Sequence, residues 1–187
     1  MSISPSSKIL NRVQLQPEDA PTLFKLIEQN RAHLSPWLPW VDSTQAVGHS
    51  LAFIEASLNA ATTGTALRFG ILVNNELAGM IGLESLNAPP RTAQIGYWLA
   101  AQEQGQGIIR RILPEIIEHG FETLDLTRVE IRVCPNNQRS RAIPLALGFC
   151  LQQVLPAGET SGGVDYDQEQ FILNKADWAL KIREPTP

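Results

Sequence analysis

The chain is short of several residue classes that would point to particular kinds of protein. Its 187 residues include two cysteines, Cys134 and Cys150, whose spacing fits neither a metal site nor a redox motif. We interpret both as reduced, partly buried thiols of a cytoplasmic protein. No apolar run is long enough to span a membrane, and the first residues lack the charged and apolar blocks of a signal peptide. The sequence therefore favours a cytoplasmic protein without a metal centre.

Basic residues are also scarce. Lysine and arginine number 15 against 19 aspartates and glutamates, which gives a formal net charge of −4. A broad nucleic-acid-binding face would need an excess of positive charge, so direct nucleic-acid binding is not expected. A basic polypeptide partner is compatible with the mildly acidic surface. Internal repeats and low-complexity linkers are absent as well, so residues 1–187 are predicted to form one domain with a flexible tail over residues 1–8.

What is present is a succession of strand and helix patterns. Strands are predicted at residues 9–15, 67–73, 77–86, 92–100, 128–133, 149–155 and 166–173. Helices are predicted from residue 18 to residue 30, from residue 43 or 44 to residue 64, and at 107–121, 138–147 and 176–182. Residues 158–163 are expected to form a loop. Strands flanked by helices in this order predict an α+β domain whose mixed sheet is covered on its faces.

Two prolines fall inside predicted helices, Pro114 and Pro144. Each lacks an N–H group, so the carbonyl four residues earlier, of Arg110 and of Ser140, loses its helical partner. We expect kinked helices rather than broken ones.

The segment IGYWLAAQEQGQGIIRR, residues 95–111, joins a predicted buried strand directly to a helix. A helix start presents unpaired N–H groups and the positive end of the helix dipole, and both favour an anion. Gly105 and Gly107 lack side chains, so the backbone can approach such an anion closely. Arg110 and Arg111 can add charge-assisted contacts. The segment is therefore a candidate phosphate-binding site.

Two glycines at this spacing are, on their own, more typical of a strand–helix turn that binds nothing. A dinucleotide-binding loop is not supported, because the third glycine of G-x-G-x-x-G and a preceding βαβ unit are missing. A P-loop is excluded, because no Gly-Lys-Ser/Thr follows.

Together with its neighbours, however, the segment resembles a known family. The run Q-x-x-G-x-G of residues 102–107 is similar to the Q/R-x-x-G-x-G/A signature of the GNAT acyltransferases. The preceding IGYWL, the N-Q-R-S of residues 137–140 and the L-G-F of residues 147–149 resemble the branch that acetylates ribosomal-protein N-termini, the RimJ/RimL type. The likeness covers nearly the whole chain. It implies the GNAT fold, a mixed, mostly antiparallel sheet of about seven strands flanked by helices.

The resemblance also implies acetyl-CoA as the acyl donor, without a metal. In that family the backbone after the central strand binds the pyrophosphate, and the strand edge pairs with the pantetheine amides. Carried over to this sequence, cofactor binding is assigned to Trp98, Leu99, Ala100, Gln102, Gln104, Gly105, Gln106, Gly107, Ile108, Ile109, Arg110 and Asn137.

Acyl transfer to an amine needs a neutral amine, a polarised thioester carbonyl and a protonated leaving thiolate. The resemblance implies that Ser140 hydrogen-bonds the sulfur of CoA and helps to protonate it, a role that a tyrosine has in many other GNAT enzymes. Counted forward from L-G-F, Glu159 falls where RimL-like proteins carry a glutamate thought to activate the amine. We therefore predict Ser140 and Glu159 as catalytic residues. Gln94 stands where relatives often have glutamate, and a neutral amide cannot serve as a base.

Trp37 and Trp40 lie in a proline-stiffened segment, LSPWLPWV, which cannot be regular helix. Large aromatic side chains in such a segment are often core residues, whereas the resemblance favours a wall of the acceptor site. One tryptophan can pack inward while the other faces the acceptor. His33 and His49 lie nearby and are assigned no role.

These observations predict an N-acetyltransferase that uses acetyl-CoA and acts by direct attack of a primary amine in a ternary complex. A protein N-terminal serine or alanine is the first choice of acceptor. The alternatives are a small-molecule amine (a polyamine, an aminoglycoside or an amino-acid derivative) and a non-catalytic acyl-CoA-binding module. A covalent route through Cys134 stays open, because that cysteine follows a strand near the predicted cleft. Relatives are often dimers, so a homodimer also stays open, although no sequence feature indicates an interface.

Overall fold

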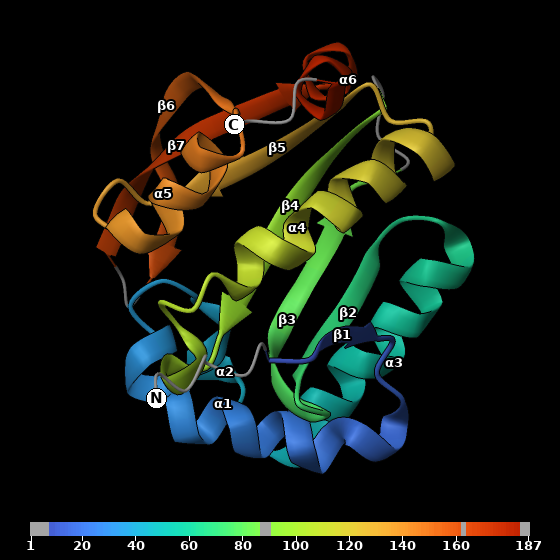
Figure 1. The fold of residues 1–187 in the computed structure, drawn as a ribbon. Helices are drawn as coiled ribbons and strands as arrows, with labels where there is room; N and C mark the ends of the chain where they lie inside the picture. Colours follow the sequence, from blue (N-terminus) through green and yellow to red (C-terminus); the bar gives the residue numbers. More distant parts are fainter. Residues whose placement is uncertain (1–7, 87–90, 162–163, 184–187) are drawn as a thin grey trace, which may run out of the picture.

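The computed structural model describes residues 8–86, 91–161 and 164–183. They form one seven-stranded sheet in the order β1-β2-β3-β4-β5-β7-β6 (Figure 1). The strands are β1 Leu10–Val13, β2 Leu67–Val73, β3 Glu76–Glu84, β4 Thr92–Leu99, β5 Arg128–Val133, β6 Cys150–Ser161 and β7 Val164–Asn174. Neighbouring strands are antiparallel except for β4 and β5, which are parallel. The mixed, mostly antiparallel sheet that the sequence predicted is confirmed.

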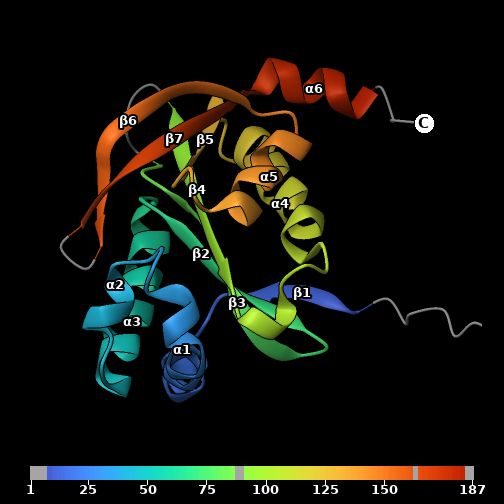
Figure 2. The ribbon, with the colours of Figure 1, turned by 90° about the vertical axis from the view of Figure 1, so that its left-hand side faces the viewer.

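Helices cover both faces of the sheet. They are α1 Ala20–Leu34, α2 Trp40–Ser43, α3 Val47–Thr63, α4 Ile108–Glu118, α5 Gln138–Ala146 and α6 Lys175–Arg183, with short turns η1 Pro17–Asp19, η2 Ala101–Glu103 and η3 His119–Thr123. Figure 2 shows α1, α2 and α3 on one face and α4 and α5 on the other. In the part of the chain that the structure describes, none of the helices has the length and apolar character needed to cross a membrane.

Two apolar layers hold these helices to the sheet. The larger lies beneath α4, whose residues Leu113, Ile116 and Ile117 are fully buried because apolar side chains recur at helical spacing. The smaller lies beneath α1 and α3, with Leu23 and Ile54 at its centre. Burial of this kind stabilises by about 25 cal/mol for each Å² of apolar surface removed from water. Helices are therefore packed against both faces of the sheet.

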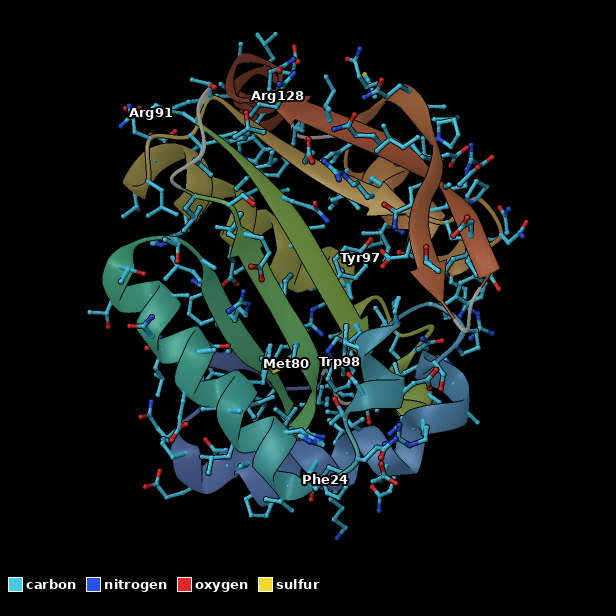
Figure 3. The ribbon with its side chains drawn as sticks, turned by 180° about the vertical axis from the view of Figure 1, so that it is seen from behind. Phe24, Met80, Arg91, Tyr97, Trp98 and Arg128 are labelled. Carbon is cyan, nitrogen blue, oxygen red and sulfur yellow. The ribbon has the colours of Figure 1, made fainter. Side chains whose placement is uncertain are left out.

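The sheet opens between β4 and β5. Their parallel pairing runs only from Thr92↔Arg128 to Gln94↔Glu130. Beyond that point β4 continues with β3 as far as Gly79↔Leu99, and β5 continues with β7 as far as Val133↔Glu169. The two strands therefore diverge toward their carboxyl ends (Figure 1). Figure 3 marks the paired end with Arg91 and Arg128, and the open end with Tyr97 and Trp98.

The structure corrects two sequence predictions. The loop predicted at residues 158–163 is wrong, because β6 continues to Ser161 and Glu159 pairs with Tyr166 of β7. A register shift between Leu155 and Glu159 absorbs the extra residues, so the turn-rich sequence still forms a hairpin. Residues 162 and 163 lie outside the described residues.

The second correction concerns the start of α3. Neither Ser43 nor Thr44 caps it, because both hydroxyls donate to the carbonyl of Trp40, the first residue of α2. Ala46 precedes the first helical residue instead. The predicted end at Gly64 is confirmed, and its φ of 67° is the left-handed conformation that ends helices. The predicted tail lies outside the described residues apart from Lys8.

Candidate active site

A cleft of about 810 Å³ opens where β4 and β5 separate. Its walls come from the end of β4, the start of α4, the start of α5, the segment after α1 and the β6–β7 hairpin. Most residues predicted for the site line it, namely Trp37, Trp98, Leu99, Gln104, Gly105, Gly107, Ile108, Ile109, Arg110, Asn137, Ser140 and Glu159. Four do not line it, Trp40, Ala100, Gln102 and Gln106. Segments as far apart in sequence as those of His33 and Gln168 thus meet around one space.

The glycine loop, residues 102–107, turns the chain from β4 into α4. Gly105 and Gly107 have φ angles of 72° and 71°, the left-handed region that favours glycine. A Cβ atom built on either would meet nothing within 4 Å, so the backbone there faces open space. Glycine is therefore needed at both positions for the conformation rather than to avoid a packed neighbour.

The start of α4 is open to a ligand. Among the described residues no side chain caps the helix at Gly107, and the first helical bond runs from the N–H of Arg111 to the carbonyl of Gly107. The N–H groups of Ile108, Ile109 and Arg110 therefore have no acceptor within the helix. With the positive end of the helix dipole, these groups favour a negatively charged ligand at this wall of the cleft.

The predicted residues that do not line the cleft contact the segments that do. Gln106 donates from Nε2 to the carbonyl of Gln102 at 2.8 Å, which closes the glycine loop on itself. The N–H of Ala100 donates to the carbonyl of Ala78 at 2.8 Å and fixes the end of β4. The ring of Trp40 packs against that of Trp98, with centroids 6.0 Å apart and planes tilted by 51°. Trp37 lines the cleft, whereas Trp40 is 38% exposed and does not pack into the core as one of the two tryptophans was expected to do.

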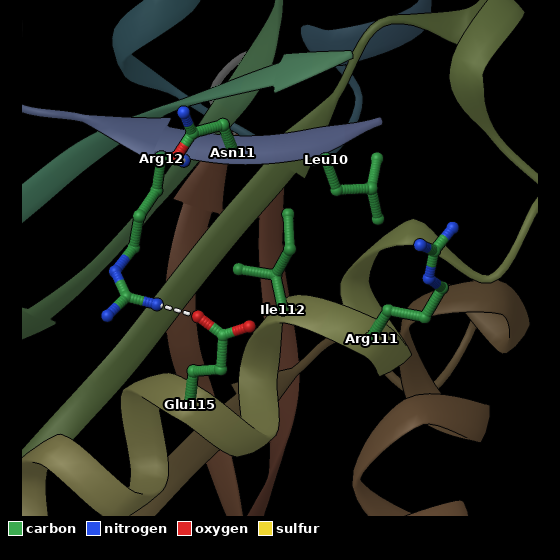
Figure 4. Close-up of a pocket in the computed structure, with 6 residues that line it drawn as sticks. All are labelled: Leu10, Asn11, Arg12, Arg111, Ile112 and Glu115. Atoms are coloured by element: carbon green, nitrogen blue, oxygen red, sulfur yellow. Dashed lines mark hydrogen bonds and ion pairs between the residues drawn. The ribbon is translucent and has the colours of Figure 1, made fainter. Parts of the chain in front are cut away.

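The two arginines at the start of α4 do not share a site. Arg110 lines the cleft, whereas Arg111 lines a separate pocket of about 380 Å³ between β1 and α4 (Figure 4). Consecutive helical residues point about 100° apart, which separates them. In the second pocket Arg12 forms an ion pair with Glu115. A shared anion contact through Arg111 is therefore not supported.

Gln104 connects two other residues that line the cleft, His33 and Arg139. Its Oε1 accepts from Nη1 of Arg139 at 2.8 Å, and because a guanidinium only donates, this contact fixes the orientation of the amide. Its Nε2 then donates to Nε2 of His33 at 2.7 Å, so that ring nitrogen is the acceptor. The bridge connects α1, the glycine loop and α5. His33 was given no role by the sequence, since nothing local indicated a partner 71 residues away.

Asn137 and Ser140 form the start of α5. The side-chain oxygen of Asn137 accepts from the N–H of Ser140 at 3.2 Å and caps the helix, as its sequence position predicted. The Ser140 hydroxyl donates to the hydroxyl of Tyr97 at 3.3 Å. The Tyr97 hydroxyl in turn donates to the carbonyl of Ser140 at 3.2 Å. One tyrosine of β4 therefore contacts the predicted catalytic serine twice.

Tyr97 was missed by the sequence reasoning, although it lines the cleft. Burial raises the pKa of Tyr97 from 10.0 to about 12, and the hydrogen bond from Ser140 offsets this in part. Its phenol therefore stays protonated at neutral pH. The available signal was strand alternation, which places Tyr97 on the same face as Ile95 and Leu99, toward α4 and α5.

Glu159 lines the cleft from β6. Its Oε2 accepts from Nε2 of Gln168 at 2.9 Å, and Gln168 is itself buried. None of the ion pairs formed by the described residues includes Glu159, whereas the nearby Arg132 pairs with Glu130 at 2.7 Å. The carboxylate is thus held by a neutral amide and is free to meet a cationic or amine group.

Comparison with known proteins identifies the family. Residues 10–150 match the acetyltransferase (GNAT) domain family. The chain belongs to the GNAT acetyltransferases. YdaF of Bacillus subtilis (strain 168) is 33% identical to it over 165 residues, which cover 88% of this chain and 90% of YdaF. The ribosomal-protein-serine acetyltransferase of Escherichia coli (strain K12) is 31% identical over 137 residues, covering 73% and 76% of the two chains.

Solved structures agree with this assignment. RimL, a ribosomal L7/L12 α-N-protein acetyltransferase in complex with coenzyme A, is 25% identical with a TM-score of 0.86, over 92% of this chain and 97% of RimL. The microcin C7 self-immunity acetyltransferase MccE, in complex with acetyl-CoA and AMP, is 28% identical with a TM-score of 0.85, over 90% and 93%. This GNAT acetyltransferase is therefore an N-acetyltransferase of the RimJ/RimL-like type.

Proposed function

We propose that this GNAT acetyltransferase moves the acetyl group of acetyl-CoA to the N-terminal α-amine of a protein, such as a ribosomal protein. One observation carries the proposal: the uncapped start of α4, Ser140 and Glu159 all line the same cleft between β4 and β5. The donor can then lie along the glycine loop while the amine approaches from the β6–β7 hairpin. Relatives that act on ribosomal proteins support this acceptor. We also place the enzyme in the cytoplasm, where such an acceptor would be found.

On the donor side, we assign the pyrophosphate to the free N–H groups at the start of α4, because these groups and the helix dipole favour a divalent anion. Arg110 would add a charge-assisted contact. The pantetheine arm would lie along the open edge of Trp98, Leu99 and Ala100. Asn137 uses its side-chain oxygen as a helix cap, which leaves its NH₂ group to meet that arm.

In the reaction itself, the amine nitrogen attacks the thioester carbonyl carbon, and the C–S bond then breaks with its electron pair leaving on sulfur. Glu159 accepts the proton that the amine must lose, directly or through a water molecule. Ser140 donates a hydrogen bond to the departing sulfur. The proton taken from the amine finally neutralises the thiolate through solvent, so CoA leaves as the thiol.

The charges around the cleft argue against a polyamine. Its lining carries three arginines, Arg110, Arg132 and Arg139, and two glutamates, Glu103 and Glu159. Glu103 is already paired with Lys8 at 2.7 Å. A polycation would need several free carboxylates, since each additional unpaired charge costs desolvation energy. One free carboxylate suits an acceptor with a single amine, and the rings of Trp37 and Trp98, which line the cleft, suit its apolar part.

The test is thiol release from acetyl-CoA with a panel of acceptors. Peptides beginning with serine or alanine should be turned over, and the same peptides carrying an N-terminal acetyl group are the matched control that should not react. Turnover confined to small amines would overturn the protein acceptor. Tight acetyl-CoA binding without release for any acceptor would favour a binding module.

The role of Glu159 has a separate test. Glu159→Gln keeps the size of the side chain but removes the base, so kcat should fall about 100-fold and its rise with pH should flatten. Glu103→Gln is the matched control, because it removes the other lining carboxylate and should keep the rise. An unchanged pH–rate profile in Glu159→Gln would remove this residue from the role of base.

A further inference from the structure

The proline inside α5 leaves a carbonyl group for the sheet to satisfy. Pro144 has no N–H, so the carbonyl of Ser140, four residues earlier, has no helical donor. Tyr97 of β4 supplies the missing donor through its hydroxyl at 3.2 Å. A gap in the hydrogen bonding of one helix is therefore closed by a tyrosine 43 residues away in sequence.

The same tyrosine controls where the serine proton points. A phenol has one proton, and that of Tyr97 is directed to the carbonyl of Ser140. The Tyr97 oxygen is left as an acceptor, and the Ser140 hydroxyl donates to it at 3.3 Å. In this arrangement the serine proton is directed at the tyrosine. It must turn about the Cβ–Oγ bond before it can reach a sulfur atom in the cleft.

We propose that Tyr97 is a positioning residue that exchanges hydrogen bonds with Ser140 during turnover. As negative charge develops on sulfur, the Ser140 hydroxyl turns to the sulfur and the Tyr97 hydroxyl turns from the Ser140 carbonyl to the Ser140 oxygen. No proton leaves either oxygen, and the thiolate gains a chain of two hydroxyl donors. The inference rests on the proposed function, in which Ser140 meets the leaving sulfur.

Two properties of the pair support this exchange. The carbonyl of Ser140 and its hydroxyl are both within reach of one phenol, so the switch needs only rotation of two O–H groups. Burial keeps the pKa of Tyr97 at about 12, so the phenol remains a donor through the neutral range. Hydroxyl groups in a chain polarise one another, which strengthens the last donor in the chain.

A double-mutant cycle in kcat tests the coupling. Tyr97→Phe keeps the ring and removes the hydroxyl, so kcat should fall about tenfold while the acetyl-CoA dissociation constant stays within about twofold. In a Ser140→Ala background the same substitution should change kcat by less than about twofold, because the tyrosine acts through the serine hydroxyl. Losses that simply multiply in the double variant would overturn the proposal.

A second pair of variants separates positioning from structure. Tyr97→Phe leaves the Ser140 carbonyl without its donor, so Tm should fall by about 2–4 °C. Adding Pro144→Ala returns an N–H to α5 at the position that can donate to this carbonyl. Tm should then recover while kcat stays low. Recovery of kcat together with Tm would show that the tyrosine acts only through stability, and would overturn the proposal.

The outcomes also separate this inference from the proposed role of the serine. A Ser140→Ala variant with the kcat of the wild type would remove Ser140 from the mechanism, and the inference would fall with it. A slow Ser140→Ala variant beside a Tyr97→Phe variant with wild-type kcat would overturn the inference alone.

Discussion

The phenol of Tyr97 links the packing around the cleft to the pH dependence of folding. Burial raises its pKa from 10.0 to about 12, so the folded protein keeps a proton over a pH range in which the unfolded chain loses it. A raised pKa in the folded state means that this contribution to stability is present below pH 10. It is lost as the pH rises toward 12. At about 1.36 kcal/mol for each pKa unit, the complete loss is about 2.7 kcal/mol.

Chemical denaturation of the wild type and of Tyr97→Phe at pH 7, 9 and 11 measures this loss. Between pH 9 and pH 11 the wild type should lose about 1.3 kcal/mol more of its free energy of unfolding than the variant, whose ring does not ionise. At pH 7 the variant should be less stable by about 1 kcal/mol, because the Ser140 carbonyl has lost its donor. The stability difference should therefore stay constant from pH 7 to pH 9 and then nearly vanish.

Other groups that titrate at high pH are present in both proteins and cancel in the difference. A difference that stays constant through pH 11 would show that the phenol ionises as easily in the folded protein as in the unfolded chain. That result would refute the half-buried placement of the Tyr97 side chain against α5, and with it the hydrogen bonds between Tyr97 and Ser140.

Three further substitutions, one of them with a matched control, test other parts of the molecule. Gly105→Val should raise the KM for acetyl-CoA at least tenfold, since a left-handed backbone costs a non-glycine residue about 1–2 kcal/mol and the side chain would enter the cleft; an unchanged KM would contradict a donor site at the loop. Gly79→Ala should lower the free energy of unfolding by about 2 kcal/mol, because the new Cβ would lie 2.1 Å from the carbonyl oxygen of Trp98. Gly48→Ala in α3, where a Cβ meets nothing within 4 Å, is its control and should be neutral or stabilising in the same denaturation assay. Cys134→Ser should retain full kcat if the amine attacks directly, whereas a large loss would revive a covalent acyl-enzyme route.

Local patterns in the sequence were sufficient for the wall that we propose faces the donor. Each of its features can be recognised from a short stretch of sequence: the strand before the glycine loop, the two glycines and the apolar periodicity of α4. The different directions of Arg110 and Arg111 could also have been predicted, because they depend only on helical geometry. The cap of α5 at Asn137 likewise followed from the residue type and its position before a helix.

The rest of the cleft depends on contacts between distant segments. Glu159 was placed in a loop because G-E-T-S-G-G is rich in turn residues, yet pairing with β7 made it part of a strand. The carbonyl freed by Pro144 was foreseen, but its donor was not, because Tyr97 and Ser140 meet only once β4 and α5 pack together. Tertiary contacts of this kind leave no signal in either segment alone.

The short ladder between β4 and β5 leaves the sheet incomplete at the cleft. Within the residues that the structure describes, the β4–β5 ladder ends at Gln94↔Glu130, so the facing edges of the two strands beyond it do not pair with each other. A donor whose amides pair with that edge would complete the sheet as an extra strand. Saturation with acetyl-CoA at 100 times its Kd would then stabilise the fold by about 2.7 kcal/mol. Binding of the donor would then complete the sheet. A variant in which β4 and β5 paired along their whole length would be more rigid, but it could no longer bind the donor.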